Sequence, residues 1–211
     1  MSPGPARNRV SPLGDILAVP GRGAWMGNRG RLHQGRGTRD VVRNHQTTAW
    51  LICMLSFKDR RVAQWDPHRY TPLFFLDEAV AFAAGHRPCA ECRRSAFATF
   101  QDAWQQTQGG ARPRAGEIDA QLHTERRRDG TGARRLHHAN WSSLPDGAFV
   151  LVDQGPVVVV GDHLAVWVGT QNRYGPHLSR PSTGTAAVVT PPSTVAILRA
   201  GYPVEVDAAA R

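Results

Sequence analysis

The sequence predicts an α+β protein whose two parts differ in character. Three of the four stretches with helical periodicity lie between residues 77 and 128, whereas short runs of β-forming residues separated by turns dominate after residue 140. Charge changes at the same place. Residues 1–139 contain 22 Lys and Arg against 12 Asp and Glu, and residues 140–211 contain 4 against 5. We therefore expect a basic first part and a nearly neutral β-rich second part.

Composition and periodicity predict four segments along the chain. Residues 1–20 are rich in Pro, Gly and Arg without periodicity, which indicates a flexible leader. Residues 21–110 form the first folded part, residues 111–139 a connector, and residues 140–211 a small β-rich module with a terminal helix. No run has the length of a signal sequence or the roughly 18 apolar residues of a membrane span. We therefore expect a soluble, cytoplasmic protein with reduced thiols.

The first folded part contains three well-marked elements. Ala49–Phe57 reads AWLICMLSF, an apolar run typical of a buried strand. Asp77 and Glu78 place acidic residues in the first turn of a short helix that stops at Gly85. Apolar residues at helical spacing then predict an amphipathic helix over Arg93–Thr107.

The rest of the chain is predicted as one more helix followed by the β-rich module. Glu117–Arg128 favours a short helix. The turn dipeptide Gln154-Gly155 separates two β-forming runs and predicts a hairpin. The expected strands are Ala148–Val152, Pro156–Val160, Leu164–Val168, Ala186–Thr190 and Val204–Val206, with a helix over Thr194–Ala200.

Cys89 and Cys92 form a Cys-x-x-Cys pair directly after the short helix. At this spacing one turn directs two sulfur atoms at a single ion, as in many zinc sites. A redox pair is the weaker interpretation because no βαβ pattern surrounds the motif. The third cysteine, Cys53, is either a small buried hydrophobe or a further ligand.

The stretch FFLDEAVAFAAGHRPCAEC resembles the end of the zinc-binding domain of the Ada DNA-repair family. That family has a strand, a short helix ending in Ala-Gly, and an Arg-Pro-Cys-x-x-Cys turn that supplies two of four zinc ligands. The resemblance is strongest over residues 74–92 and extends loosely over residues 25–94. It implies a small Ada-like zinc-binding domain before the β-rich module. The matching residues are Phe74-Phe75, Ala79, Ala83-Ala84-Gly85, Arg87-Pro88-Cys89 and Cys92.

The resemblance places the two remaining ligands upstream on a hairpin. The family has a Cys-x-x-x-Cys pair there, which this chain lacks, so Cys53 and one histidine are the candidates. A hairpin that pairs Leu32-His33 with Ile52-Cys53 would bring both side chains to the Cys-x-x-Cys turn. His86 is the second choice for the histidine, followed by His45 and His68. The predicted Zn²⁺ ligands are Cys53, Cys89, Cys92 and His33, a structural Cys₃His site.

The excess of arginine in the first part predicts a polyanionic partner, with nucleic acid as the first candidate and DNA favoured over RNA. The arginines expected at phosphates are Arg29, Arg31, Arg93 and Arg94. The resemblance implies DNA repair, in which an upstream zinc thiolate accepts a methyl group from DNA phosphotriesters. The apolar run around Cys53 favours a purely structural zinc instead.

Two other classes of function remain open. His123, Glu125 and His137 are weak candidates for the catalytic groups of an enzyme acting on nucleic acid or a nucleotide, since His and Glu transfer protons near neutral pH. A solvated helix and loop is the simpler interpretation of these residues. The third class is a structural or protein-interaction module.

Overall fold

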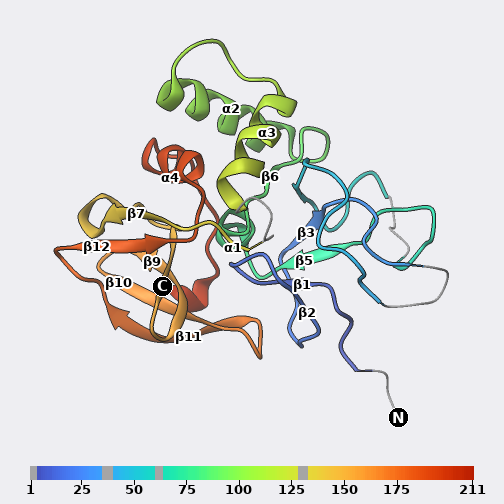
Figure 1. Cartoon of the computed structure of the whole chain (residues 1–211), viewed down its shortest axis with the longest axis horizontal. Helices are drawn as coiled ribbons and strands as arrows, with labels where there is room; N and C mark the ends of the chain where they lie inside the picture. The colour runs from blue at the N-terminus through green and yellow to red at the C-terminus, as the bar shows by residue number, and fades with distance from the viewer. Residues whose placement is uncertain (1–3, 35–39, 60–63, 128–132) are drawn as a thin grey trace.

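A computed structural model describes residues 4–34, 40–59, 64–127 and 133–211 (Figure 1). The described residues form two six-stranded sheets and four α-helices, which confirms the mixed α+β class. No helix in these ranges is long and apolar enough to cross a membrane. Cytoplasmic location remains a prediction.

The first sheet is built by the N-terminal 88 residues, in the order β2-β1-β5-β3-β4-β6. Most neighbours run antiparallel, but β1 pairs with β5 and β4 pairs with β6 in parallel. The parallel pairing of β4 and β6 matters most for the site, because it aligns the chain around Cys53 with the chain entering the Cys-x-x-Cys turn. The strands are β1 (Arg9–Val10), β2 (Ile16–Leu17), β3 (Trp25–Asn28), β4 (Leu51–Cys53), β5 (Leu73–Phe75) and β6 (Arg87–Pro88).

The structure differs from the sequence prediction at the start of the chain. Part of the expected leader, residues 1–20, forms β1 and β2 at one edge of the first sheet. Val10 and Ile16 are buried in the core. The isolated apolar residues of this segment are therefore strand residues, too few to show a periodicity in the sequence.

The predicted hairpin has the wrong register. Cys53 pairs with Met26, and Ile52 pairs with Gly27, instead of with residues 32–33. The reason is that β3 is a central strand, whose other edge pairs with β5, so Met26 also lies opposite Phe74. His33 lies outside this strand and forms an isolated bridge with Val41.

The second sheet is wholly antiparallel, in the order β11-β10-β9-β8-β12-β7. The strands expected between residues 148 and 168 are present as β8, β9 and β10. Residues 204–206, expected as a strand, contain no regular structure. The strands are β7 (His137–Asn140), β8 (Phe149–Val152), β9 (Gly155–Val160), β10 (His163–Val168), β11 (Arg173–Ser179) and β12 (Thr185–Val188).

Helices connect and cover the two sheets. In Figure 1, α1 lies centrally between the sheets, α2 and α3 lie at the top, and α4, which packs against α2, lies below them. All six residues of α1 are buried. The helices are α1 (Glu78–Ala83), α2 (Arg94–Gln108), α3 (Ala115–Arg126) and α4 (Pro192–Arg199), and short 3₁₀ turns occupy Trp141–Ser143 and Ala208–Ala210.

The two predicted modules share one continuous hydrophobic core. The same cluster of buried residues contains Phe82 and Phe100 from the first part and Phe149 and Tyr202 from the second. The expected connector, residues 111–139, is also folded, because α3 buries Ile118 and the following strand β7 joins the second sheet. The core therefore crosses the predicted boundaries.

Two buried carboxylates at the start of α1 bind the C-terminal segment. Asp77 caps the helix by accepting from the amide of Val80 at 2.8 Å, and it also accepts from the Tyr174 hydroxyl at 2.8 Å. Glu78 accepts from the Tyr202 hydroxyl at 3.0 Å and from the amide of Glu205 at 3.1 Å. The acidic first turn predicted from the helix dipole thus also joins the two parts of the chain.

Candidate metal centre

The three cysteines meet at the end of the first sheet. Cys53 is the last residue of β4, and Cys89 and Cys92 lie in the turn between β6 and α2. Their sulfur atoms all lie within 4.8 Å of one another. The sheet produces this meeting, because Ile52 is in register with Pro88 and the amide of Cys89 donates to the carbonyl of Ile52 at 2.9 Å.

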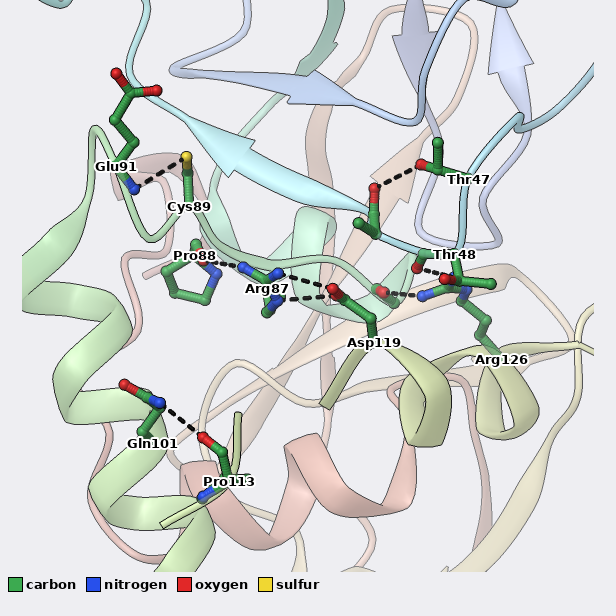
Figure 2. Close-up of polar contacts among 12 residues, drawn as sticks. Thr47, Thr48, Arg87, Pro88, Cys89, Glu91, Gln101, Pro113, Asp119 and Arg126 are labelled. Carbon is green, nitrogen blue, oxygen red and sulfur yellow. Dashed lines mark hydrogen bonds and ion pairs between the residues drawn. The ribbon is translucent and has the colours of Figure 1, made fainter. Parts of the chain in front are cut away.

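Backbone amides donate to two of the sulfur atoms. The amide of Glu91 donates to Cys89 Sγ at 3.4 Å (Figure 2), and the amide of Met54 donates to Cys92 Sγ at 3.4 Å. Hydrogen bonds of this kind favour the deprotonated form of a thiol, which is the form that binds metal. The turn thus presents two sulfur atoms that the backbone prepares as thiolates.

The three thiols differ in acidity because they share hydrogen bonds. A hydrogen bond from Cys53 lowers the pKa of Cys89 to about 5, with further help from the amides of Cys92 and Glu91. The same donor lowers the pKa of Cys92. The pKa of Cys53 is raised by its hydrogen bonds to the other two sulfur atoms and by burial. In the absence of metal, the cluster therefore holds its charge on the Cys-x-x-Cys pair.

A buried ion pair fixes the strand that leads into the turn. Arg87 Nε and Nη2 donate to the two carboxylate oxygens of Asp119 at 2.9 and 2.8 Å, and Arg87 Nη1 donates to the carbonyl of Pro88 at 3.0 Å (Figure 2). Both side chains are at most 9% exposed. Asp119 lies on α3, so this bidentate pair anchors the Cys-x-x-Cys turn to that helix.

An open cavity of about 170 Å³ lies directly against the sulfur atoms. Its walls are mainly apolar. Two of the lining residues, Met54 and Leu55, are 41% and 53% exposed. A ligand entering this cavity would reach the cysteines from solvent. Besides the three cysteines, the lining residues are Met26, Asn28, Leu51, Met54, Leu55, Phe57, Tyr70 and Glu91.

The predicted histidine ligand lies elsewhere. Both ring nitrogens of His33 are engaged, Nδ1 with Thr71 Oγ1 at 2.7 Å and Nε2 with the carbonyl of Asp66 at 3.0 Å. His86, the second choice, is fully buried beside Phe75, and its Nε2 accepts from Arg29. Among the described residues, the group that could hold a metal contains the three cysteines and no histidine.

The two remaining histidine candidates are also engaged or distant from the sulfur atoms. His45 Nδ1 lies 2.9 Å from Arg127 Nη1, and its ring packs against His123. His68 is exposed and lines a neighbouring cavity with Arg69 and Tyr70. Within the described ranges, none of the four candidate histidines therefore belongs to the group that could hold a metal.

Two of the four arginines expected at phosphates are interior residues. Arg29 has no exposed surface, and Arg93 is 9% exposed and pairs with Glu78. The structure places Arg31 and Arg94 on the surface. The charge pattern of the sequence did not distinguish the two buried arginines from the two exposed ones. An arginine that stacks on a tryptophan ring looks the same in a sequence as one that faces solvent. Arg29 lies over Trp50, and Arg93 lies over Trp25.

The candidate catalytic residues have separate contacts. The Nδ1 atom of His123 lies 2.8 Å from Arg126 Nη2. Glu125 accepts from the backbone amide and hydroxyl of Ser193, which places its carboxylate at the start of α4. His137 lies on β7, opposite Val188. These contacts do not assemble the three residues into one acid–base site.

Comparison with protein-family models, with curated proteins and with solved structures finds no match to this chain. The resemblance to the Ada zinc domain therefore rests on the sequence of residues 74–92. Function has to be argued from the chemistry of the site itself.

Proposed function

We propose that Cys53, Cys89 and Cys92 bind one zinc ion through their thiolates, and that its fourth position faces the cavity. The observation that carries this proposal is the convergence of three sulfur atoms within 4.8 Å. A tetrahedral zinc ion with bonds of about 2.3 Å holds its sulfur ligands about 3.8 Å apart. Thiolates are soft ligands that select zinc over the hard cations magnesium and calcium.

The chain's own groups prepare the site for such an ion. The amides of Glu91 and Met54 stabilise negative charge on two sulfur atoms, and Arg87 with Asp119 holds the approach to the turn. Bound zinc would supply a Lewis acid with one position for a ligand from outside the chain. The cavity around that position is mainly apolar. It therefore favours a ligand that has one metal-coordinating atom and an apolar remainder.

Metal analysis tests the zinc proposal. We expect protein purified without added metal to contain one zinc per chain, and Cys53→Ser, Cys89→Ser and Cys92→Ser each to lose it. His33→Ala and His86→Ala should keep the metal. If His33→Ala lost zinc while circular dichroism showed that it was still folded, His33 would be a ligand and the proposed open position would be wrong.

Cobalt substitution tests the open position separately. Tetrahedral cobalt bound to thiolates has a characteristic visible spectrum that changes when its fourth ligand changes. We expect added imidazole or a small thiol to alter the spectrum of the cobalt protein. Narrowing of the cavity by Leu51→Phe should weaken this response without loss of cobalt. An unchanged spectrum at saturating imidazole would mean that the chain closes the site.

A second proposal is that nucleic acid lies across the surface beside this cavity, as the Ada resemblance implies. A neighbouring cavity of about 450 Å³ shares Asn28, Leu51 and Tyr70 with the metal cavity and is lined by Arg31 and Arg69. Phosphates along such a surface would be bound by these exposed cations. DNA repair, and the preference for DNA over RNA, belong to this proposal alone.

Salt-dependent binding tests the nucleic-acid proposal. Arg31→Gln and Arg69→Gln should each weaken binding of a short DNA duplex and reduce the slope of log K against log salt by about 1. Arg173→Gln, an exposed arginine on β11 of the other sheet, is the matched control and should change neither. Equal losses in all three variants would indicate a non-specific charge effect and contradict the proposal.

A further inference from the structure

A third cavity is lined by arginines and by none of the three cysteines. It has a volume of about 110 Å³, and three of its lining residues are Arg126, Arg127 and Arg134. Arg29 lies behind its wall and donates from Nη1 to the carbonyl of Gly14, another lining residue, at 2.8 Å. Four guanidinium groups therefore converge on one small space.

Two of these arginines are as deeply buried as core residues. Arg29 is 0% exposed and Arg126 is 1% exposed, which makes them the largest fully buried side chains among the described residues. Their guanidinium carbons lie 3.8 and 3.9 Å from the ring centroid of Trp50. Stacking on an indole ring offsets part of the cost of burying a cation, but it does not neutralise the charge.

The acceptors that these arginines use are mainly neutral carbonyl groups. Arg126 donates to the carbonyls of Gly85 and Thr48 at 2.9 and 2.8 Å (Figure 2), and Arg134 donates to those of Ala83 and Val189. These bonds orient the side chains and leave the positive charges in place. The hydrogen bonds thus explain how the arginines are oriented, but neutral carbonyl groups do not compensate the guanidinium charges.

Nearby carboxylates in the described part of the chain are committed elsewhere or exposed. Asp119 forms its bidentate pair with Arg87, and Glu125 accepts from Ser193. Asp15 lines the cavity but is exposed to solvent. Within the described ranges, no carboxylate forms an ion pair with Arg29, Arg126, Arg127 or Arg134.

The cluster also has unused donors. Among the described residues, no hydrogen-bond acceptor faces the buried nitrogen atoms Arg29 Nη2, Arg126 Nε and Arg134 Nε. An unsatisfied buried donor costs about 1–3 kcal/mol, and more when the group is charged. Three such donors in one charged cluster could donate to an oxyanion.

We propose that this cavity binds a small oxyanion of the phosphate class, held by Arg126, Arg127 and Arg134 with Arg29 behind them. Guanidinium groups match the geometry of phosphate oxygens through paired N–H donors, and burial strengthens each such bond. The cavity, with a volume of about 110 Å³, has room for a single oxyanion group. Asn44 and Gly14 add polar atoms to its wall.

The histidines beside the cluster give an independent readout of its electrostatic field. Burial, followed by Arg127, His123, Arg126 and Arg29, lowers the pKa of His45 to about 4. Burial and two of the same arginines lower the pKa of His123. A bound anion would cancel part of this positive field, so it should raise the pKa of both histidines.

Titration with inorganic phosphate at constant ionic strength, with chloride as the reference anion, tests the site by calorimetry and thermal unfolding. We expect saturable binding with one phosphate per chain and a higher melting temperature. Arg127→Gln, the substitution of a partly exposed arginine, should weaken binding at least tenfold. Asp15→Asn removes the one acidic lining group and should tighten it several-fold. Asp162→Asn, on a turn of the second sheet, makes the same charge change and should alter nothing.

Histidine signals in NMR spectra keep the test decisive if a variant does not fold. Phosphate added to the wild-type protein should raise the pKa of His45 and leave the chemical shifts of exposed His138 unchanged. If a short phosphomonoester binds more tightly than inorganic phosphate, the ligand of the cavity is a larger molecule that carries a phosphate group. Equal affinities would identify the ligand as the free ion. Absence of saturable binding at millimolar phosphate, or equal responses in Asp15→Asn and Asp162→Asn, would overturn the proposal.

Discussion

The buried ion pair between Glu78 and Arg93 links the Cys-x-x-Cys turn to the C-terminal segment. Arg93 Nη1 donates to Glu78 Oε1 at 2.6 Å, and the two side chains are 7% and 1% exposed. The same carboxylate also accepts from Tyr202 and from the amide of Glu205. Removal of one member leaves the other charge buried and unpaired, at a cost of about 3–5 kcal/mol. We expect Glu78→Gln to lower the free energy of unfolding by that amount.

A double-mutant cycle measures the coupling of this pair. Arg93→Met should also be strongly destabilising, because it leaves Glu78 uncompensated and removes the cation that lies 3.8 Å from the ring centroid of Trp25. The double variant contains neither charge, so its loss should be about 2–3 kcal/mol smaller than the sum of the single losses. Urea unfolding at fixed zinc concentration, followed by circular dichroism, gives all three values.

The exposed pair between Arg112 and Asp102 is the matched control for this cycle. Its side chains are 46% and 65% exposed, so removal of either charge should change the free energy of unfolding by about 1 kcal/mol or less. Additive losses in the buried cycle, to within about 0.5 kcal/mol, would refute the coupling. Equal losses in the two cycles would refute the argument from burial.

Three further predictions concern groups around α1 and the turn. Burial raises the pKa of Asp77 from its ordinary 3.8 to about 6, so its contribution to stability is complete below pH 3.8 and lost as the pH rises through 6. The free energy of unfolding of Asp77→Asn, measured in urea, should therefore rise relative to that of wild type by on the order of 3 kcal/mol between pH 4 and 7. Parallel plots of this free energy against pH for the two proteins would contradict the prediction. Asp119→Asn should lower zinc affinity about tenfold or more by releasing Arg87, and an unchanged affinity in competition with a chelator would argue against that anchor. Gly85→Ala should lower the melting temperature more than Gly109→Ala, because both glycines have positive φ but only at Gly85 would the new methyl lie 2.6 Å from another side chain, that of Arg126.

Local signals in the sequence predicted much of the first part correctly. The acidic first turn and the glycine stop located α1, which spans Glu78–Ala83 with Gly85 two residues beyond. The apolar periodicity located α2 to within one residue at each end, since it spans Arg94–Gln108. The spacing of the cysteines identified the turn at which the sulfur atoms converge. These features depend on neighbours in the sequence, so a single chain suffices to find them.

The errors arose where distant segments decide the outcome. The register of Cys53 depends on the pairing of β3 with β5, which no turn residue specifies. The role of His33 was inferred from that register, and the structure places this residue in a bridge with Val41, outside the group of three cysteines. The burial of Arg29 and Arg93 depends on two tryptophan rings contributed by other strands or loops. Such pairings follow from the complete fold and leave no periodic pattern in the sequence.

The order in which the fold creates the metal site follows from its connections. Adjacent parallel strands require a crossover, and between β4 and β6 that crossover contains β5 and α1. The position of α1 therefore fixes the position of Cys89 relative to Cys53, and Asp77 and Glu78 fix α1 against the C-terminal segment. The bonds involved, such as that from the amide of Cys89 to Ile52, need no metal. The sheet accordingly brings the sulfur atoms together through backbone pairing, so the zinc ion that we propose would bind at a geometry that the polypeptide sets by itself.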